Sequence, residues 1–213
     1  GWAQAVESPI GNGYYLVGGI SAGDLFSDTA VARNEVWFYE PTSDNWSSQA
    51  SMVAARYGHT AAWVNDGICV VGGIEPPLIF QSKMECYQPG GTGTWREITD
   101  GTLNIPRYGA GSVVTPNNRW FIFGGTTVDS SNQHVAVSAV EFFDFQNPEA
   151  GWQILPIRYD LGGSDNIFPR AWVQTEFVNS HVYAVGGNDT SSATNYFVTT
   201  LVQTLFVPQE LLL

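Results

Sequence analysis

A doubled glycine recurs four times along this chain of 213 residues, each time directly after a short hydrophobic run. The four pairs are Gly18-Gly19, Gly72-Gly73, Gly124-Gly125 and Gly186-Gly187. Self-similarity at a period of about 50 residues indicates a repeat architecture, in which each unit packs on its neighbours. This period constrains the fold more than any single motif does, and it leaves the function open.

Two further features recur in step with the glycines. An aromatic-rich run leads through a turn of Pro, Gly, Asp or Asn residues to a tryptophan, namely Trp46, Trp95 and Trp152. An arginine then precedes the next glycine pair at a nearly constant interval, namely Arg56, Arg107 and Arg170. Short aromatic and β-branched runs between turn residues are typical of strands, and no window shows a sustained helical period. The pattern predicts an all-β chain.

These features together resemble the kelch repeat, and the resemblance covers nearly the whole chain. It implies a kelch-type β-propeller of four four-stranded antiparallel blades, which form either a complete small ring or part of a larger one. We expect a single domain over 1–213, with blades at about 1–52, 53–103, 104–156 and 157–213. In the second blade the expected strands are 58–65, 67–73, 83–88 and 95–98. The fourth repeat lacks the tryptophan, so it is expected to be a divergent closing or capping unit.

The charge balance limits the class of partner. The chain carries 20 acidic and 8 basic residues, for a net charge of −12. Such an excess argues against nucleic acid and anionic membranes as partners. No signal peptide, transit peptide or membrane-spanning stretch is visible, so no membrane insertion is expected. No calcium-loop pattern and no zinc-like histidine spacing occurs, so neither a metal nor another cofactor is expected.

The two cysteines occupy positions that hold aromatic pairs in other repeats. Cys69 and Cys86 correspond to Tyr15 and Phe38 in the first repeat and to Phe121 and Phe142 in the third. Such positions should face each other on neighbouring antiparallel strands, where Cβ atoms lie about 4.5–5.5 Å apart. A relaxed disulfide has a Cβ–Cβ distance of about 3.8 Å. Both a disulfide and two reduced, buried cysteines therefore fit the pattern.

Two sequences match the N-glycosylation motif, at Asn45 and Asn188. Asn188 directly follows a glycine pair in an expected loop, and Asn45 lies in the turn before Trp46. The chain also holds a single lysine, Lys83. These features favour an extracellular, glycosylated protein, and a cytoplasmic location is the alternative.

The repeated arginines are the candidate binding residues. One repeated position should place Arg56, Arg107 and Arg170 around a ring, with Tyr57 and Tyr108 beside two of them. Because guanidinium groups match carboxylates and carbonyls, this set could recognise an acidic peptide, a carboxylate or a sugar acid. The alternative is structural: each arginine ties its own blade to carbonyl groups or to a glutamate. Glu35, Glu85 and Glu141 recur and are candidate partners for that role.

Binding could instead lie in the longest expected non-strand stretches, since insertions in repeat proteins often carry it. These stretches are 20–33, 74–82, 126–137 and 157–168.

Three classes of function follow. The leading hypothesis is a non-enzymatic module that binds protein or carbohydrate, including an extracellular structural subunit that self-associates through blade faces. The first alternative is an intracellular kelch adaptor for protein–protein interaction. The second is an enzyme resembling a sugar-acid isomerase on a kelch scaffold. No catalytic residue is assigned, because no nucleophile motif or phosphate loop occurs.

Overall fold

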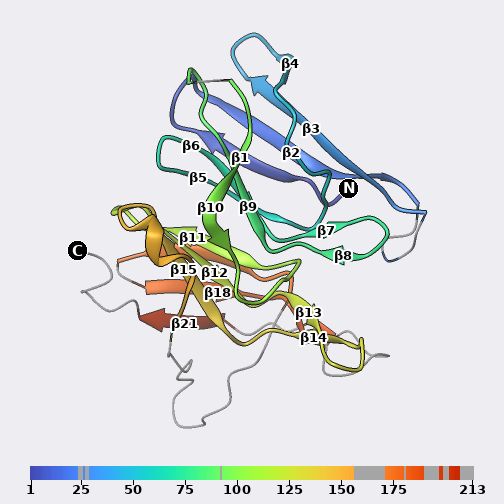
Figure 1. The fold of residues 1–213 in the computed structure, drawn as a ribbon. Helices are drawn as coiled ribbons and strands as arrows, with labels where there is room; N and C mark the ends of the chain where they lie inside the picture. Colours follow the sequence, from blue (N-terminus) through green and yellow to red (C-terminus); the bar gives the residue numbers. More distant parts are fainter. Residues whose placement is uncertain are drawn as a thin grey trace. The chain divides into compact units, whose positions relative to one another are not determined.

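The computed structural model describes residues 1–23, 26, 29–91, 93–155, 171–179, 181–189, 197–198 and 202–206. In this part of the chain the regular structure is antiparallel strands and one short 3-10 turn at Pro148–Ala150 (Figure 1). The chain divides into two compact units, Gly1–Tyr108 and Gly109–Leu213. The described residues place two main sheets in each unit.

The first unit contains two four-stranded sheets. The first sheet has the order β1 (Gln4–Ser8), β2 (Gly13–Ala22), β3 (Val31–Glu40), β4 (Asn45–Gln49). The second has the order β5 (Thr60–Val64), β6 (Gly67–Val71), β9 (Lys83–Tyr87), β10 (Arg96–Thr102). A two-stranded hairpin, β7 (Ile74–Glu75) and β8 (Ile79–Phe80), stands between β6 and β9 in the chain.

The second unit repeats this plan. Its first sheet has the order β11 (Gly111–Val114), β12 (Arg119–Phe123), β15 (Val140–Asp144), β16 (Gln153–Ile154), with the hairpin β13 (Thr126–Val128) and β14 (His134–Ala136). The other sheet has three described strands, β17 (Gln174–Val178), β18 (His181–Val185) and β21 (Val202–Phe206), with the hairpin β19 (Asn188–Asp189) and β20 (Phe197–Val198).

Each unit buries an apolar core between its sheets. In the first unit Val6, Tyr15, Val17, Val36 and Met52 pack with Ile68, Val70 and Tyr87 of the second sheet and with Trp95, which directly precedes β10. In the second unit Val113, Phe121, Phe123, Val140, Phe142 and Leu155 pack with Val182. A sheet with two apolar faces cannot bury both by itself, so stacking of sheets is what stabilises each repeat.

The glycine pairs mark the place where one repeat touches the start of the next. The amide of Gly19 donates to the carbonyl of Arg56 at 2.9 Å, and that of Gly73 donates to the carbonyl of Arg107 at 2.8 Å. Gly72 has a φ of 71°, and a Cβ there would lie 2.5 Å from the Arg107 carbonyl oxygen. Only glycine tolerates both the left-handed backbone and this close approach.

The predicted fold class is confirmed: the chain is all-β, and its four main sheets correspond to the four repeats. The second sheet agrees with its expected strands to within a few residues. Three of the stretches that were predicted to contain no strand do contain strands. Residues 20–33, 74–82 and 126–137 contribute paired strands, because each glycine pair is followed by a hairpin. The stretch 157–168 lies outside the described residues.

Candidate functional site

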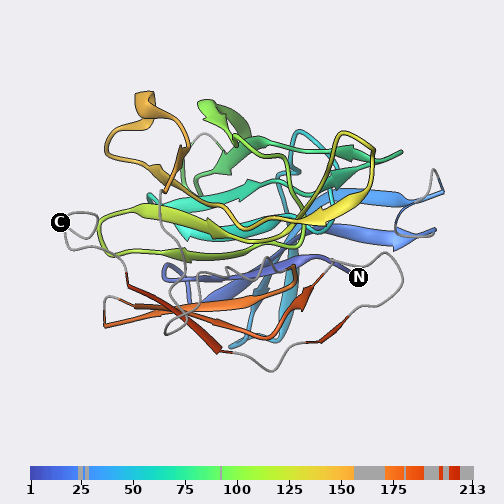
Figure 2. The same cartoon turned by 90° about the horizontal axis from the view of Figure 1, so that it is seen from below.

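The hairpins of the first unit form one structural feature, which we call the hairpin edge. It consists of the paired far ends of β2 and β3, beyond Gly19, and of the hairpin β7–β8, beyond Gly73. Figure 2 shows the blue hairpin that β2 and β3 form. The strand register shifts between Val17 and Gly19 and again between Ile20 and Ala22, so the extension is bulged relative to the sheet below. Such extensions can vary without disturbing the sheets that carry them.

Aromatic side chains join the two hairpins. The ring of Tyr108 lies 5.6 Å from that of Phe26 and 5.5 Å from that of Phe80, measured between centroids. Trp2 contacts Phe26 at 5.9 Å and Tyr57 at 6.0 Å. Two of the five, Tyr57 and Tyr108, are predicted site residues, and both are buried. The structure therefore brings the two tyrosines into one aromatic cluster beneath the hairpins.

The cluster supports exposed apolar side chains. Phe26 is 39% exposed, and Leu78 and Ile79 at the tip of β7–β8 are 40% and 53% exposed. The tip also contains Pro76 and Pro77, and the side chain of Gln81 donates a hydrogen bond to Glu75 at its base. Exposed apolar residues of this size beside polar groups have the composition of an interface centre.

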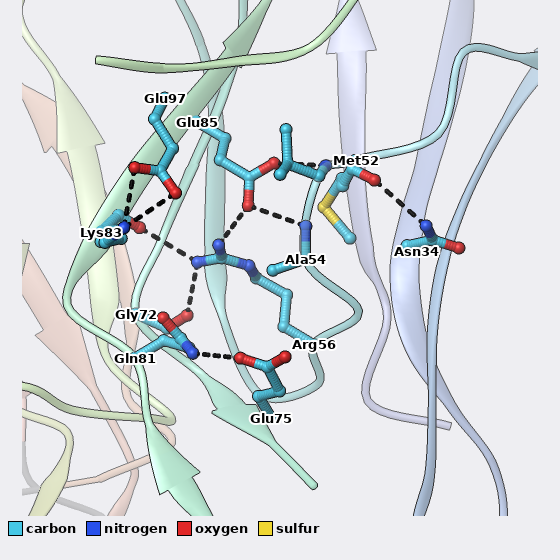
Figure 3. A network of polar contacts seen from close by, with 11 residues as sticks. Asn34, Met52, Ala54, Arg56, Gly72, Glu75, Gln81, Lys83, Glu85 and Glu97 are labelled. Carbon is cyan, nitrogen blue, oxygen red and sulfur yellow. Dashed lines mark hydrogen bonds and ion pairs between the residues drawn. The ribbon is translucent and has the colours of Figure 1, made fainter. Parts of the chain in front are cut away.

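Below the hairpin edge, Arg56 forms a buried network that ties the second sheet to the segment before it (Figure 3). Its guanidinium forms an ion pair with Glu85 and donates to the carbonyl oxygens of Gly72 at 3.1 Å and Lys83 at 3.0 Å. Glu85 in turn accepts hydrogen bonds from the backbone amides of Val53 and Ala54. Burial lowers the pKa of Arg56, and the Glu85 carboxylate offsets part of that shift.

Two of the three predicted arginines lie in the described part of the chain, and both are buried. Arg56 and Arg107 are both 1% exposed, and Arg107 Nε donates to the carbonyl of Ile105 at 3.2 Å. Arg170 lies outside the described residues. A ligand would reach Arg56 only by displacing its present partners. The geometry favours the structural interpretation of these arginines, and their role in ligand binding stays a prediction.

The predicted glutamate partners do not all share one position. Strand register pairs Glu85 with Val70 and Glu141 with Ile122, at the same place in their repeats. In the first repeat the corresponding residue is Trp37, which pairs with Leu16. Glu35 instead lies nearer the glycine pair on the same strand and forms an exposed ion pair with Arg33 at 3.4 Å. The sequence-based grouping of Glu35 with the other two was wrong.

The structure also describes the two cysteines and the two asparagines of the N-glycosylation motifs, at least in part. Cys69 and Cys86 face each other on β6 and β9 and are joined by a disulfide, with Cα atoms 4.1 Å apart. Asn45 is exposed at the start of β4. The backbone of Asn188 begins β19, and its side chain lies outside the described part. Glycosylation of either site stays a prediction.

The residues that the structure describes contain no group of three or more His, Cys, Asp or Glu side chains arranged to hold a metal ion. They also contain no helix of the length and apolar character that crossing a bilayer requires.

Comparison with known proteins now decides the family. The family model described as the Attractin/LZTR1 beta-propeller matches residues 6–205. This chain belongs to the kelch-repeat β-propeller family. It is 32% identical to Kelch-like protein 25 of Rattus norvegicus over 132 residues, which are 57% of this chain and 20% of that protein.

Two further relatives carry kelch repeats in their names. An F-box/kelch-repeat protein of Arabidopsis thaliana is 32% identical over 101 residues, or 47% of this chain and 26% of that protein. Kelch repeat and BTB domain-containing protein 12 of Homo sapiens is 26% identical over 162 residues, or 70% of this chain and 25% of that protein. The matched part of this kelch propeller thus spans about a fifth to a quarter of the length of these relatives.

Proposed function

We propose that this kelch propeller is a protein-binding module of the adaptor type, and that it binds its partner through the hairpin edge. The observation that carries the proposal is the exposure of Phe26, Leu78 and Ile79 on the two hairpins, where the ring of Phe26 packs on the buried ring of Tyr108. Interface centres are enriched in aromatic and large apolar residues that sit on rigid supports. The relatives whose names combine kelch repeats with F-box or BTB domains support the adaptor class.

The charge of the chain narrows the partner further. With a net charge of −12, the propeller attracts surfaces of opposite sign and repels acidic ones. Electrostatic complementarity of this kind raises association rates and excludes wrong partners. We therefore expect a protein whose contact surface combines an apolar centre with a basic rim, and we expect binding to weaken as salt is added.

Substitutions in the hairpin edge test this proposal. The double variant Phe26→Ala/Ile79→Asp should reduce capture of the partner by at least about tenfold in crosslinked pull-downs from cells of the native source, because truncating an interface anchor costs more than about 1 kcal/mol. The matched control is Ile154→Asp, which changes an exposed isoleucine on β16 of the second unit. Equal capture by wild type and the double variant would refute the hairpin edge as the binding site.

A second candidate function places the protein outside the cell. In this version the module binds protein or carbohydrate outside the cell or serves as a structural subunit, and the Cys69–Cys86 disulfide is the observation that favours it. Disulfides persist in oxidising compartments and are rare in the cytosol.

Intact mass and thiol labelling of the native protein separate the two locations. An extracellular protein should lose mass on glycosidase treatment, through Asn45 or Asn188, and its denatured chain should take up a thiol reagent only after reduction. An intracellular adaptor should show no glycan, and both cysteines should react without reduction. This measurement reports only the location of the protein. Neither result bears on the hairpin edge as a binding site, which the substitutions above test separately.

A further inference from the structure

Two tryptophans adopt a backbone conformation that large side chains rarely take. Apart from them, every described residue with a positive φ is a glycine, an asparagine or an aspartate. Trp2 has a φ of 59° and Trp172 a φ of 60°. In this left-handed region Cβ crowds the following carbonyl oxygen, so a bulky residue there is strained. Strain of this kind persists only where the surrounding structure enforces it.

Both tryptophans occupy the same position of the repeat. Each lies two residues before the first strand of its sheet, Trp2 before β1 and Trp172 before β17. The second and third sheets have Gly58 and Gly109 at this position, with φ values of 62° and 63°. All four repeats therefore pass through the left-handed region here. Two of them use glycine, which adopts this conformation without strain, and the other two use tryptophan.

Backbone hydrogen bonds support this alignment in the first unit. The amide of Ile20 donates to the carbonyl of Gly1 at 2.7 Å, and the amide of Ile74 donates to the carbonyl of Tyr57 at 2.9 Å. Each acceptor directly precedes the left-handed residue of its repeat. The left-handed conformation thus belongs to the repeat, and glycine would supply it at the lowest cost.

The indole of Trp2 lies in the aromatic cluster of the hairpin edge. It contacts the ring of Phe26 edge to face at 5.9 Å and the ring of Tyr57 at 6.0 Å. Trp2 is half-buried, and Phe26 is 39% exposed. In the second unit the indole of Trp172 has a different neighbour, since a Cβ on Gly109 would lie 2.9 Å from that ring. The strained tryptophan of the first unit therefore adds an aromatic surface beside an exposed residue of the hairpin edge.

We propose that Trp2 contacts the partner at the hairpin edge and receives an arginine side chain of that partner on the face of its indole. This inference rests on the function proposed above and names the group that the partner supplies. Strained residues cluster at binding sites, where function retains them. Indole is the aromatic ring that attracts cations most strongly, and arginine is enriched at interfaces and stacks on aromatic faces. The net charge of −12 also favours a cation.

Thermal unfolding of Trp2→Gly and Trp2→Ala tests whether the backbone at this residue is strained. Alanine keeps a Cβ in the left-handed region and glycine does not, so Trp2→Gly should melt about 2–4 °C above Trp2→Ala. Within ordinary strands and helices the order is the reverse. Trp2→Gly should also melt within about 4 °C of wild type, because relief of the strain offsets the lost ring contacts. A much larger fall, or a higher melting temperature for Trp2→Ala than for Trp2→Gly, would overturn the inference.

Binding of selected peptides tests the role of the indole. The probe is a set of peptides selected from a random display library on the wild-type chain, restricted to those that lose binding to Ile79→Asp. Replacing a selected arginine by citrulline, its neutral isostere, should weaken binding to wild type about 5- to 30-fold. The same replacement should change binding to Trp2→Gly little, because the ring that the cation contacts is absent. Trp2→Phe keeps a weaker aromatic face and should retain part of the difference.

The outcomes separate this inference from the proposed function. Selected peptides without an arginine, or an equal effect of citrulline on wild type and on Trp2→Gly, would overturn the role of Trp2 and leave the hairpin edge as the binding site. If every selected peptide bound Ile79→Asp as well as wild type, the hairpin edge itself would be refuted, and this inference with it. The control Trp172→Gly changes the same repeat position in the second unit. It should keep the full effect of citrulline, and circular dichroism confirms that each variant is folded.

Discussion

Replacement of Arg56 by alanine should lower the free energy of unfolding by about 3–5 kcal/mol, because it leaves the Glu85 carboxylate buried without its counter-charge. Both side chains are 1% exposed, so water cannot replace the lost partner. The same change removes the two hydrogen bonds from the guanidinium to the carbonyl oxygens of Gly72 and Lys83. Urea denaturation of wild type and variant at neutral pH measures the difference.

The matched control for this prediction is Arg33→Ala. Arg33 also pairs with a glutamate, Glu35, but at 3.4 Å with both side chains nearly half exposed. Exposed pairs contribute about 0–1 kcal/mol, so this variant should stay close to wild type. In a double-mutant cycle, Glu85→Ala and Arg56→Ala together should cost clearly less than the sum of the two single changes. Additive effects, or a cost for Arg56→Ala below about 1 kcal/mol, would contradict the structural role.

The same variant bears on the arginine set as a binding site. If Arg56 and Arg107 act on a ligand, a folded Arg56→Ala chain should lose ligand binding beyond what its lower stability explains. If Arg56 ties the sheet to the preceding segment, stability should fall while capture of the hairpin-edge partner persists in the folded fraction. The network with Glu85 and the two carbonyls favours the second result.

Most of the fold could be predicted from the repeat period. Four glycine pairs in register predicted four sheets, and a left-handed backbone does recur at each pair, with a close approach to the next repeat at the first two. Cys69 was aligned by its distance from the glycine pair and Cys86 by its place in the aromatic run, and the two residues do face each other, as the aromatic pairs of the other repeats do. Period-based reasoning works wherever the residues counted lie inside regular strands.

Positions on the main strands could not be matched between repeats by counting residues across the hairpins. The interval between a glycine pair and the buried position on the next main strand changes from repeat to repeat, because the hairpin between them changes in length. Glu35 and Glu141 stand equally far after their glycine pairs, yet they occupy different positions in the strand register. Counting back from the tryptophans comes closer, since Trp37, Glu85 and Glu141 precede Trp46, Trp95 and Trp152 by 9, 10 and 11 residues. Hairpin length varies because the sheet below does not depend on it.

The hairpin edge itself could not be read from the sequence. Strands as short as β7 and β8 cannot show alternation, so residues 74–82 looked like a loop. The aromatic cluster joins Trp2, Phe26, Tyr57, Phe80 and Tyr108, which are far apart along the chain. Only Tyr57 and Tyr108 carried a repeat signal. The other three are brought in by tertiary packing, which no local pattern encodes.

Acid should destabilise this chain through His59. Burial, with a smaller contribution from the positive charge of Arg56, lowers the pKa of His59 to about 3, although the carbonyl groups of Arg56 and Val17 offset part of the shift. The unfolded chain has an ordinary histidine pKa of about 6.5. Between pH 3 and pH 6.5, approximately, the unfolded chain therefore binds a proton at His59 that the folded chain does not bind. This contribution to stability is complete above about pH 6.5 and is lost as the pH falls towards 3.

The expected loss from this residue is about 3 kcal/mol between pH 7 and pH 4, measured as the difference in pH dependence between wild type and His59→Gln. The comparison is needed because carboxylates also titrate in this range and contribute equally to both proteins. Tyr57→Phe, a change at a neighbouring buried ring whose pKa is raised by burial, should keep the wild-type pH dependence, since its phenol stays protonated throughout. Parallel stability curves for wild type and His59→Gln would show that His59 is protonated equally in both states, which its burial against Gly18 and Gly73 argues against.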